Sequence, residues 1–125
     1  MAGERDTYRG TREYQRLYDK LVSAARNGSQ VFHAEVTEIL SDPGGDGPTV
    51  LEIGLLLGEI AEDEHRAGRP LLTALVLTGK AIPGSVFFAV ARRLGKLEGD
   101  DPAKEMKFWM DERGRVYEVW KPVAH

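Results

Sequence analysis

A glutamate on the apolar side of a helix predicted over residues 50–66 has the position best suited to acid–base chemistry in this sequence. Helical spacing places Glu64 between Leu57 and Ile60 on that face. A carboxylate there must be paired, hydrogen-bonded or protonated. Arg69 follows just after the expected helix end and can reach back to it. Glu64 and Arg69 are therefore the candidate catalytic residues, with a structural ion pair at the corner as the alternative interpretation.

Two other combinations of residues offer weaker chemistry. Ser85 begins a predicted helix, as a nucleophile can, but it lacks the Gly-x-Ser-x-Gly elbow, and capping the helix is the role we expect for it. Imidazole and carboxylate ligands suit a divalent metal, but their spacing here matches no recognised motif. We therefore predict neither a metal site nor another cofactor. The ligand set that was considered is His33, Glu35, Glu62 and His65.

Basic side chains cluster on two predicted helices and are suited to contact phosphate groups. One cluster lies on a helix over residues 11–27. The other lies at the C-terminal end of a helix over residues 86–94, where positive charge is favourable in any case. A DNA-associated protein that grips the backbone is therefore one hypothesis, and it gains support if the two clusters merge in space. The candidate phosphate contacts are Arg12, Arg16, Lys20, Arg92 and Arg93.

Acidic and aromatic side chains favour a protein partner over nucleic acid. An outward acidic stripe on the helix over 50–66 would repel phosphates, and the formal net charge of the chain is -3. We therefore expect first a small soluble interaction or regulatory module that binds a protein partner or itself, second the DNA-associated protein, and third an enzyme. An exposed Leu55 or Leu56 would add to the interface. The other candidate interface residues are Glu52, Glu59, Asp63, Trp109 and Trp120.

Length and composition are those of an ordinary globular domain. The chain has 125 residues, of which 42% are hydrophobic, enough to build a core. It contains no cysteine, which excludes disulfides and Cys-ligated metals and suits a reducing cytoplasm. The longest apolar runs are too short to span a bilayer, so we expect a cytoplasmic protein without membrane contact. We also expect a flexible N-terminus over residues 1–10 and a single globular domain over residues 11–125.

The pattern of apolar residues predicts an α+β fold that is mostly helical, with a winged-helix-like core, a small sheet and an added C-terminal helix. Residues 102–120 are predicted as one helix through Gly114, and a strand over 116–120 is the alternative. The predicted strands are a short one over 30–33 and a buried one over 71–78. The other predicted helices cover residues 11–27, 34–40, 50–66 and 86–94.

Local signals mark where these helices begin and where they are weakened. Thr11 is a candidate N-cap of the first helix. Thr49 and Glu52 have the spacing of a capping box at the start of the helix over 50–66. Gly54 and Gly58 weaken that helix by about 1 kcal/mol each relative to alanine. We expect that a neighbouring element approaches it closely there.

The order of elements resembles a winged-helix domain, and in particular the alkyltransferase-like DNA-repair proteins. In that family the winged helix precedes a Pro-Cys-His-Arg active-site strand. Here Leu72-Thr73-Ala74-Leu75 stands where Cys and His are needed, so the resemblance implies no catalytic residue. The chain is also similar to small uncharacterised prokaryotic proteins that carry a Gly-Arg-Pro-Leu-Leu-(Ser/Thr)-Ala segment. The matching segments are Gly68–Ala74, Pro83–Phe88 and Phe108-Trp109, and this resemblance implies no activity.

Overall fold

The computed structural model describes residues 7–41 and 47–122, and it confirms a mostly helical α+β chain with a small sheet. In that part of the chain no helix has both the length and the apolar character needed to cross a membrane. The strands are β1 (Val31–Phe32) and β2 (Val76–Leu77), and a 3₁₀ turn, η1 (Leu72–Leu75), precedes β2. The helices are α1 (Arg12–Asn27), α2 (His33–Leu40), α3 (Val50–Arg66), α4 (Ser85–Arg93) and α5 (Pro102–Trp120).

Most of the predicted helix ends are confirmed. The Thr11 hydroxyl accepts a hydrogen bond from the Tyr14 amide at 3.2 Å. At the start of α3, the Thr49 hydroxyl accepts from the Glu52 amide and the Glu52 carboxylate accepts from the Thr49 amide. The N-cap of α4 is Gly84 rather than Ser85, and it makes no side-chain cap hydrogen bond. The predicted cap at Ser85 is therefore wrong, because the helix already includes that residue.

The C-terminal segment is one continuous helix. α5 runs from Pro102 to Trp120 through Gly114, so the predicted helix is confirmed and the alternative strand over 116–120 is wrong. The Asp101 carboxylate caps its start by accepting from the Ala103 amide at 3.0 Å. Val116 is completely buried, because this part of α5 packs on α1 and η1.

The predicted strand over 71–78 is wrong for most of its length. Leu72–Leu75 form the 3₁₀ turn, and only Val76–Leu77 pair as a strand, parallel to β1, with Val31 opposite Val76 and Phe32 opposite Leu77. A continuous apolar run cannot by itself distinguish a buried strand from a buried helical turn. In the described residues β2 leads into a turn and α4, without a returning strand, so the sheet has two strands.

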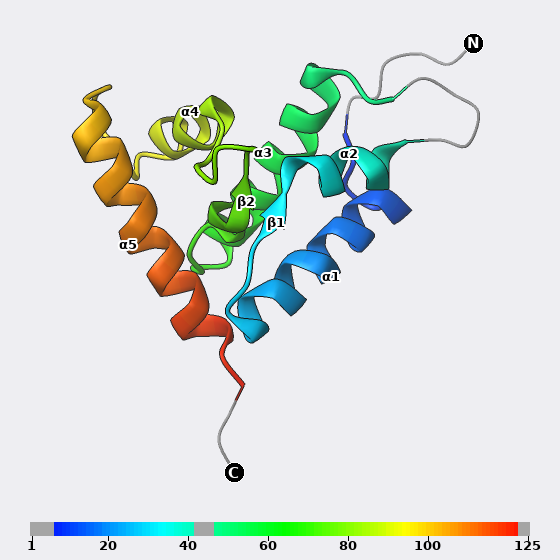
Figure 1. Ribbon diagram of the computed structural model, residues 1–125, viewed down its shortest axis with the longest axis horizontal. Helices are drawn as coiled ribbons and strands as arrows, with labels where there is room; N and C mark the ends of the chain where they lie inside the picture. The colour runs from blue at the N-terminus through cyan, green and yellow to red at the C-terminus, as the bar shows by residue number, and fades with distance from the viewer. Residues whose placement is uncertain (1–6, 42–46, 123–125) are drawn as a thin grey trace.

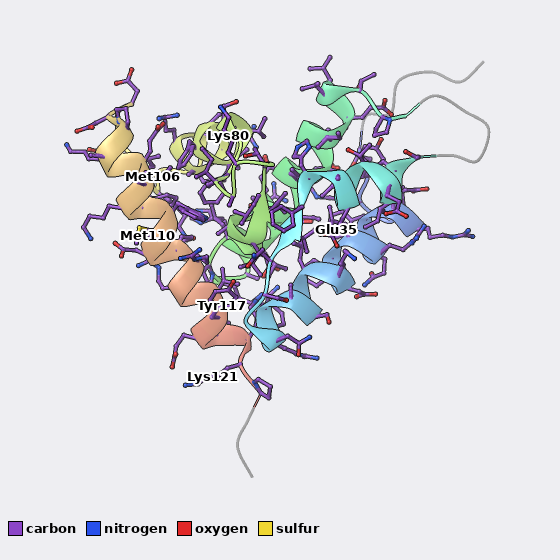
Figure 2. The ribbon with its side chains drawn as sticks, in the orientation of Figure 1. Glu35, Lys80, Met106, Met110, Tyr117 and Lys121 are labelled. Carbon is purple, nitrogen blue, oxygen red and sulfur yellow. The ribbon has the colours of Figure 1, made fainter. Side chains whose placement is uncertain are left out.

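The long helices α1 and α5 enclose the centre of the molecule. Figure 1 shows them diverging from the end nearest the C-terminus, with β1 and β2 between them. Near the point where they meet, the Tyr117 hydroxyl donates to the Ser29 carbonyl at 2.8 Å, and Figure 2 shows Tyr117 at this end of α5. The core lies where α1, α3 and α5 all pack on η1. Its completely buried apolar side chains include Leu17, Leu21, Leu56, Ile60, Leu71, Leu75 and Val116.

The glycines of α3 lie against α4 but do not need to be glycine. A Cβ added at Gly54 would meet the Val86 methyl groups at 3.8 and 3.9 Å, which is ordinary contact. We therefore expect Gly54→Ala to raise the free energy of unfolding by about 1 kcal/mol, the helix-propensity difference, and the Tm by about 4 °C. Gly28, at φ 69° after α1, is the control. Gly28→Ala should destabilise, and thermal unfolding of both variants checks the opposite signs.

Candidate functional site

Glu64 and Arg69 come together as the sequence predicts. Arg69 Nε lies 2.9 Å from Glu64 Oε2, and Arg69 Nη2 lies 2.9 Å from Glu64 Oε1. The Tyr18 hydroxyl also donates to Glu64 Oε1 at 2.9 Å. The Glu64 side chain is 1% exposed, so a substrate could not reach it without rearrangement. Both carboxylate oxygens are occupied, and this geometry is that of an ion pair holding the corner between α3 and η1.

The structure contains a second buried carboxylate that the sequence analysis missed. Glu112 of α5 is completely buried and accepts from the Leu71 amide at 2.8 Å, just before η1. Lys96 Nζ lies 2.5 Å from Glu112 Oε2, and Arg115 Nη2 lies 2.8 Å from Glu112 Oε1. Burial raises the pKa of Glu112, but these hydrogen bonds outweigh it and hold the pKa below its ordinary value. Glu112 therefore joins α5 to the start of η1.

The acidic face of α3 is partly covered by the N-terminal residues, which changes the predicted interface. Arg9 forms ion pairs with Glu59, Glu62 and Asp63 at 3.1, 2.8 and 3.0 Å. The Tyr8 amide donates to Glu59 Oε1 at 2.6 Å. Glu59 is consequently buried, so its predicted place on an outward stripe is wrong.

Part of the N-terminal segment over residues 1–10, which we expected to be flexible, makes these contacts. Tyr8 is 4% exposed and belongs to the core cluster. Its hydroxyl donates to Glu52 Oε2 at 3.1 Å. Residues 1–6 lie outside the described part of the chain. Residues 7–10 are held against α3 because its carboxylates attract Arg9 and accept from the backbone of this segment.

The predicted basic clusters are largely engaged within the chain. Lys20 pairs with Glu35 at 3.2 Å, and Figure 2 shows Glu35 on α2 facing α1. Arg93 pairs with Glu62 at 2.6 Å, and Arg92 pairs with Glu105. Among the described residues, ion pairs are absent at Arg12 and Arg16 of α1, and both side chains are exposed.

The four residues considered as metal ligands do not form a site. Glu62 pairs with Arg9 and Arg93, and Glu35 accepts from the Phe32 amide at 2.7 Å. Across residues 7–41 and 47–122, no group of three or more histidine, aspartate or glutamate residues is arranged to hold a metal ion.

The two tryptophans contact the core differently. Trp109 is buried, and its Nε1 donates to the Ala74 carbonyl at 2.9 Å, so it anchors the core. Trp120 lies under the Arg69 guanidinium, 5.6 Å from the ring centre. Leu56, proposed with Leu55 as an exposed residue, is completely buried, whereas Leu55 is half-buried.

An apolar pocket between α3 and α4 is the feature of the structure best suited to bind a ligand. It has a volume of about 170 Å³. Its lining begins at the surface with Val50 and Ser85 and reaches the buried Ala61 and Thr73. Apolar side chains form most of its walls, and these are Ile53, Leu57, Val76, Val86, Phe87 and Val90.

Three polar side chains on this lining have unused hydrogen-bonding capacity. They belong to His33, Thr73 and Ser85, and none of them hydrogen-bonds to another group of the described residues through its side chain. Thr73 is 4% exposed. Trp120 Nε1 is the sole fully enclosed side-chain polar atom without a partner in the described part of the chain. The Thr73 hydroxyl is therefore accessible rather than sealed in the core, and Thr73 is a lining residue of the pocket.

One strongly exposed apolar side chain lines this pocket, and two others are next to lining residues in the sequence. Val50 lines it, and Leu51 follows in α3; both are 80% exposed. Phe32 directly precedes the lining residue His33 and is also exposed. An exposed valine at the edge of an apolar pocket adds to the apolar surface that a ligand or protein could cover.

The pocket could not be found from the sequence, because it forms where α3, α4 and β2 meet. The exposed Val50 and Leu51 at the helix start were the available local signal. No family model, curated protein or solved structure matches the chain. The chemistry of the pocket is therefore the basis on which a function can be proposed.

Proposed function

We propose that this protein is a small interaction module that binds a protein partner by taking one of its apolar side chains into the pocket between α3 and α4. The observation that supports this is an apolar cavity whose lining includes the exposed Val50, the residue before the equally exposed Leu51 in α3. Binding energy at protein interfaces concentrates where an anchor side chain fills such a pocket. A cytoplasmic location is part of the proposal, because a chain without cysteine suits a reducing compartment.

The other two functions have less support. Contact with a DNA backbone would depend on Arg12 and Arg16, since Lys20, Arg92 and Arg93 already pair with carboxylates. An enzyme would depend on Glu64, whose carboxylate is buried and engaged by Arg69. The pocket, in contrast, is accessible and carries unused polar groups.

A photocrosslinking residue at position 51 tests this function. In cells that express the protein naturally, benzoylphenylalanine in place of Leu51 is expected to form a discrete adduct with a partner. Gly54→Leu should reduce the yield at least five-fold, because Gly54 lines the pocket and a leucine there would fill it. Mass spectrometry of the adduct would identify the partner, and an adduct of twice the chain mass would show self-association.

Two controls make the result specific. The crosslinker at Met110, 56% exposed on α5, should give no such adduct; Figure 2 shows Met110 across the view from α2. Gly114→Leu should leave the Leu51 adduct intact, since a Cβ at Gly114 would have no neighbour within 4 Å among the described residues. Equal adducts at both positions, or an adduct that survives Gly54→Leu in a folded variant, would contradict the proposed function.

A further inference from the structure

We infer that the side chain bound in this pocket is a tyrosine, an inference that rests on the proposed function and specifies its partner. Three features of the pocket lead to it: its size, its apolar walls, and the unpaired, accessible hydroxyl of Thr73. Together they describe a group that is apolar along its length and carries a hydrogen-bonding atom at its tip.

The size of the pocket selects a single ring. Its volume is about 170 Å³. An engineered apolar cavity of roughly 150 Å³ binds one benzene molecule, whereas sites for drug-sized ligands begin at about 300 Å³. One six-membered aromatic ring therefore fits, and an indole or a larger ligand would have to displace the walls.

The walls exclude a charged group at the tip. Ile53, Leu57 and Val90 are among the apolar side chains around the cavity, and its lining contains no aspartate, glutamate, lysine or arginine. A buried charge without a partner is costly. A lysine or arginine side chain would consequently enter without a carboxylate to pair with.

Thr73 distinguishes tyrosine from phenylalanine. Thr73 is 4% exposed, and its hydroxyl has no hydrogen-bond partner in the described part of the chain. Water can satisfy this hydroxyl while the pocket is empty. A purely apolar ring that displaces the water would leave the hydroxyl unpaired, at a cost comparable to a lost hydrogen bond. A phenol can donate to or accept from Thr73 and so avoids that cost.

NMR titration of the full chain with model compounds tests this inference. The probes are N-acetyl-tyrosinamide, N-acetyl-phenylalaninamide and N-acetyl-leucinamide, and the readout is the amide shifts of Ala61, Thr73 and Val90. We expect the tyrosine probe to bind about five-fold more tightly than the phenylalanine probe, the value of one neutral hydrogen bond. Thr73→Val should abolish this preference, whereas Thr73→Ser, which keeps the hydroxyl, should retain it.

The outcomes separate the two proposals. If the phenylalanine or leucine probe binds as tightly as the tyrosine probe at the same amides, the tyrosine inference is overturned and the interaction function stands. If p-cresol shifts these amides and the tyrosine probe does not, the pocket recognises a free phenolic compound and both proposals are overturned. If no probe shifts them in the wild type, or Gly54→Leu leaves the shifts unchanged, the pocket is not a binding site and both fail.

Discussion

Glu64→Ala is expected to lower the free energy of unfolding by about 3 kcal/mol, because breaking a buried ion pair strands the remaining partner. The substitution removes the acceptor of three hydrogen bonds, two from Arg69 and one from the Tyr18 hydroxyl. The Arg69 side chain is 38% exposed and can turn to water, which places the loss at the lower end of the range for buried pairs. Urea unfolding monitored by circular dichroism measures the difference.

Arg66 supplies the matched control for this prediction. It lies near Glu64 in α3, its side chain is 71% exposed, and its pairing distance to Asp63 is 3.7 Å. Arg66→Ala should therefore change stability by less than about 0.5 kcal/mol. Equal effects of the two substitutions would show that Glu64 does not hold the corner between α3 and η1. A catalytic role for Glu64 would instead require a variant that keeps its stability and loses an activity.

Glu64 and Glu112 show how much about a buried carboxylate can be inferred from the sequence. Glu64 is surrounded in sequence by apolar residues at helical spacing, so its burial follows from the pattern of its own helix. Glu112 has Asp111 before it and Arg113 after it, but Trp109 and Val116 stand three and four residues away on the same side of the helix. Its burial results from the packing of α5 against η1, a contact between segments about 40 residues apart. The helical spacing therefore offered a signal for the burial of Glu112, but it could not reveal the partners Leu71 and Lys96, which come from other segments.

The candidate surfaces also combine features that the local sequence predicted with features that only tertiary contacts determine. The acidic stripe on α3 was correctly assigned to a helix, but residues 7–10 cover part of it through contacts spanning some 50 residues. The run over 71–78 was correctly predicted to be buried, and its backbone is a 3₁₀ turn because Ala74 donates to the Leu71 carbonyl. Local sequence patterns therefore predicted most helices and their caps. The pocket could not be predicted in this way, because it forms by tertiary packing.

Glu112→Gln is expected to lower the free energy of unfolding at pH 7 by about 3 kcal/mol, again in the range for a broken buried ion pair. The amide oxygen of glutamine can still accept from the Leu71 amide. It cannot neutralise Lys96, whose Nζ lies 2.5 Å from the Glu112 carboxylate and whose side chain is 21% exposed. Asp111→Asn is the control on the same helix, and it should leave the urea midpoint nearly unchanged because Asp111 is exposed.

Acidification should remove this difference between the wild type and Glu112→Gln. The Glu112 pKa is lower in the folded chain than its ordinary value of 4.5, so the folded state binds the proton less readily than the unfolded state. The stabilisation is therefore fully present above pH 4.5 and is lost as the pH falls through the folded pKa. Unfolding curves at pH 7, 5, 4 and 3 should converge for the two proteins. A gap that stays constant down to pH 3 would mean that the carboxylate charge contributes nothing and that the loss comes from packing alone.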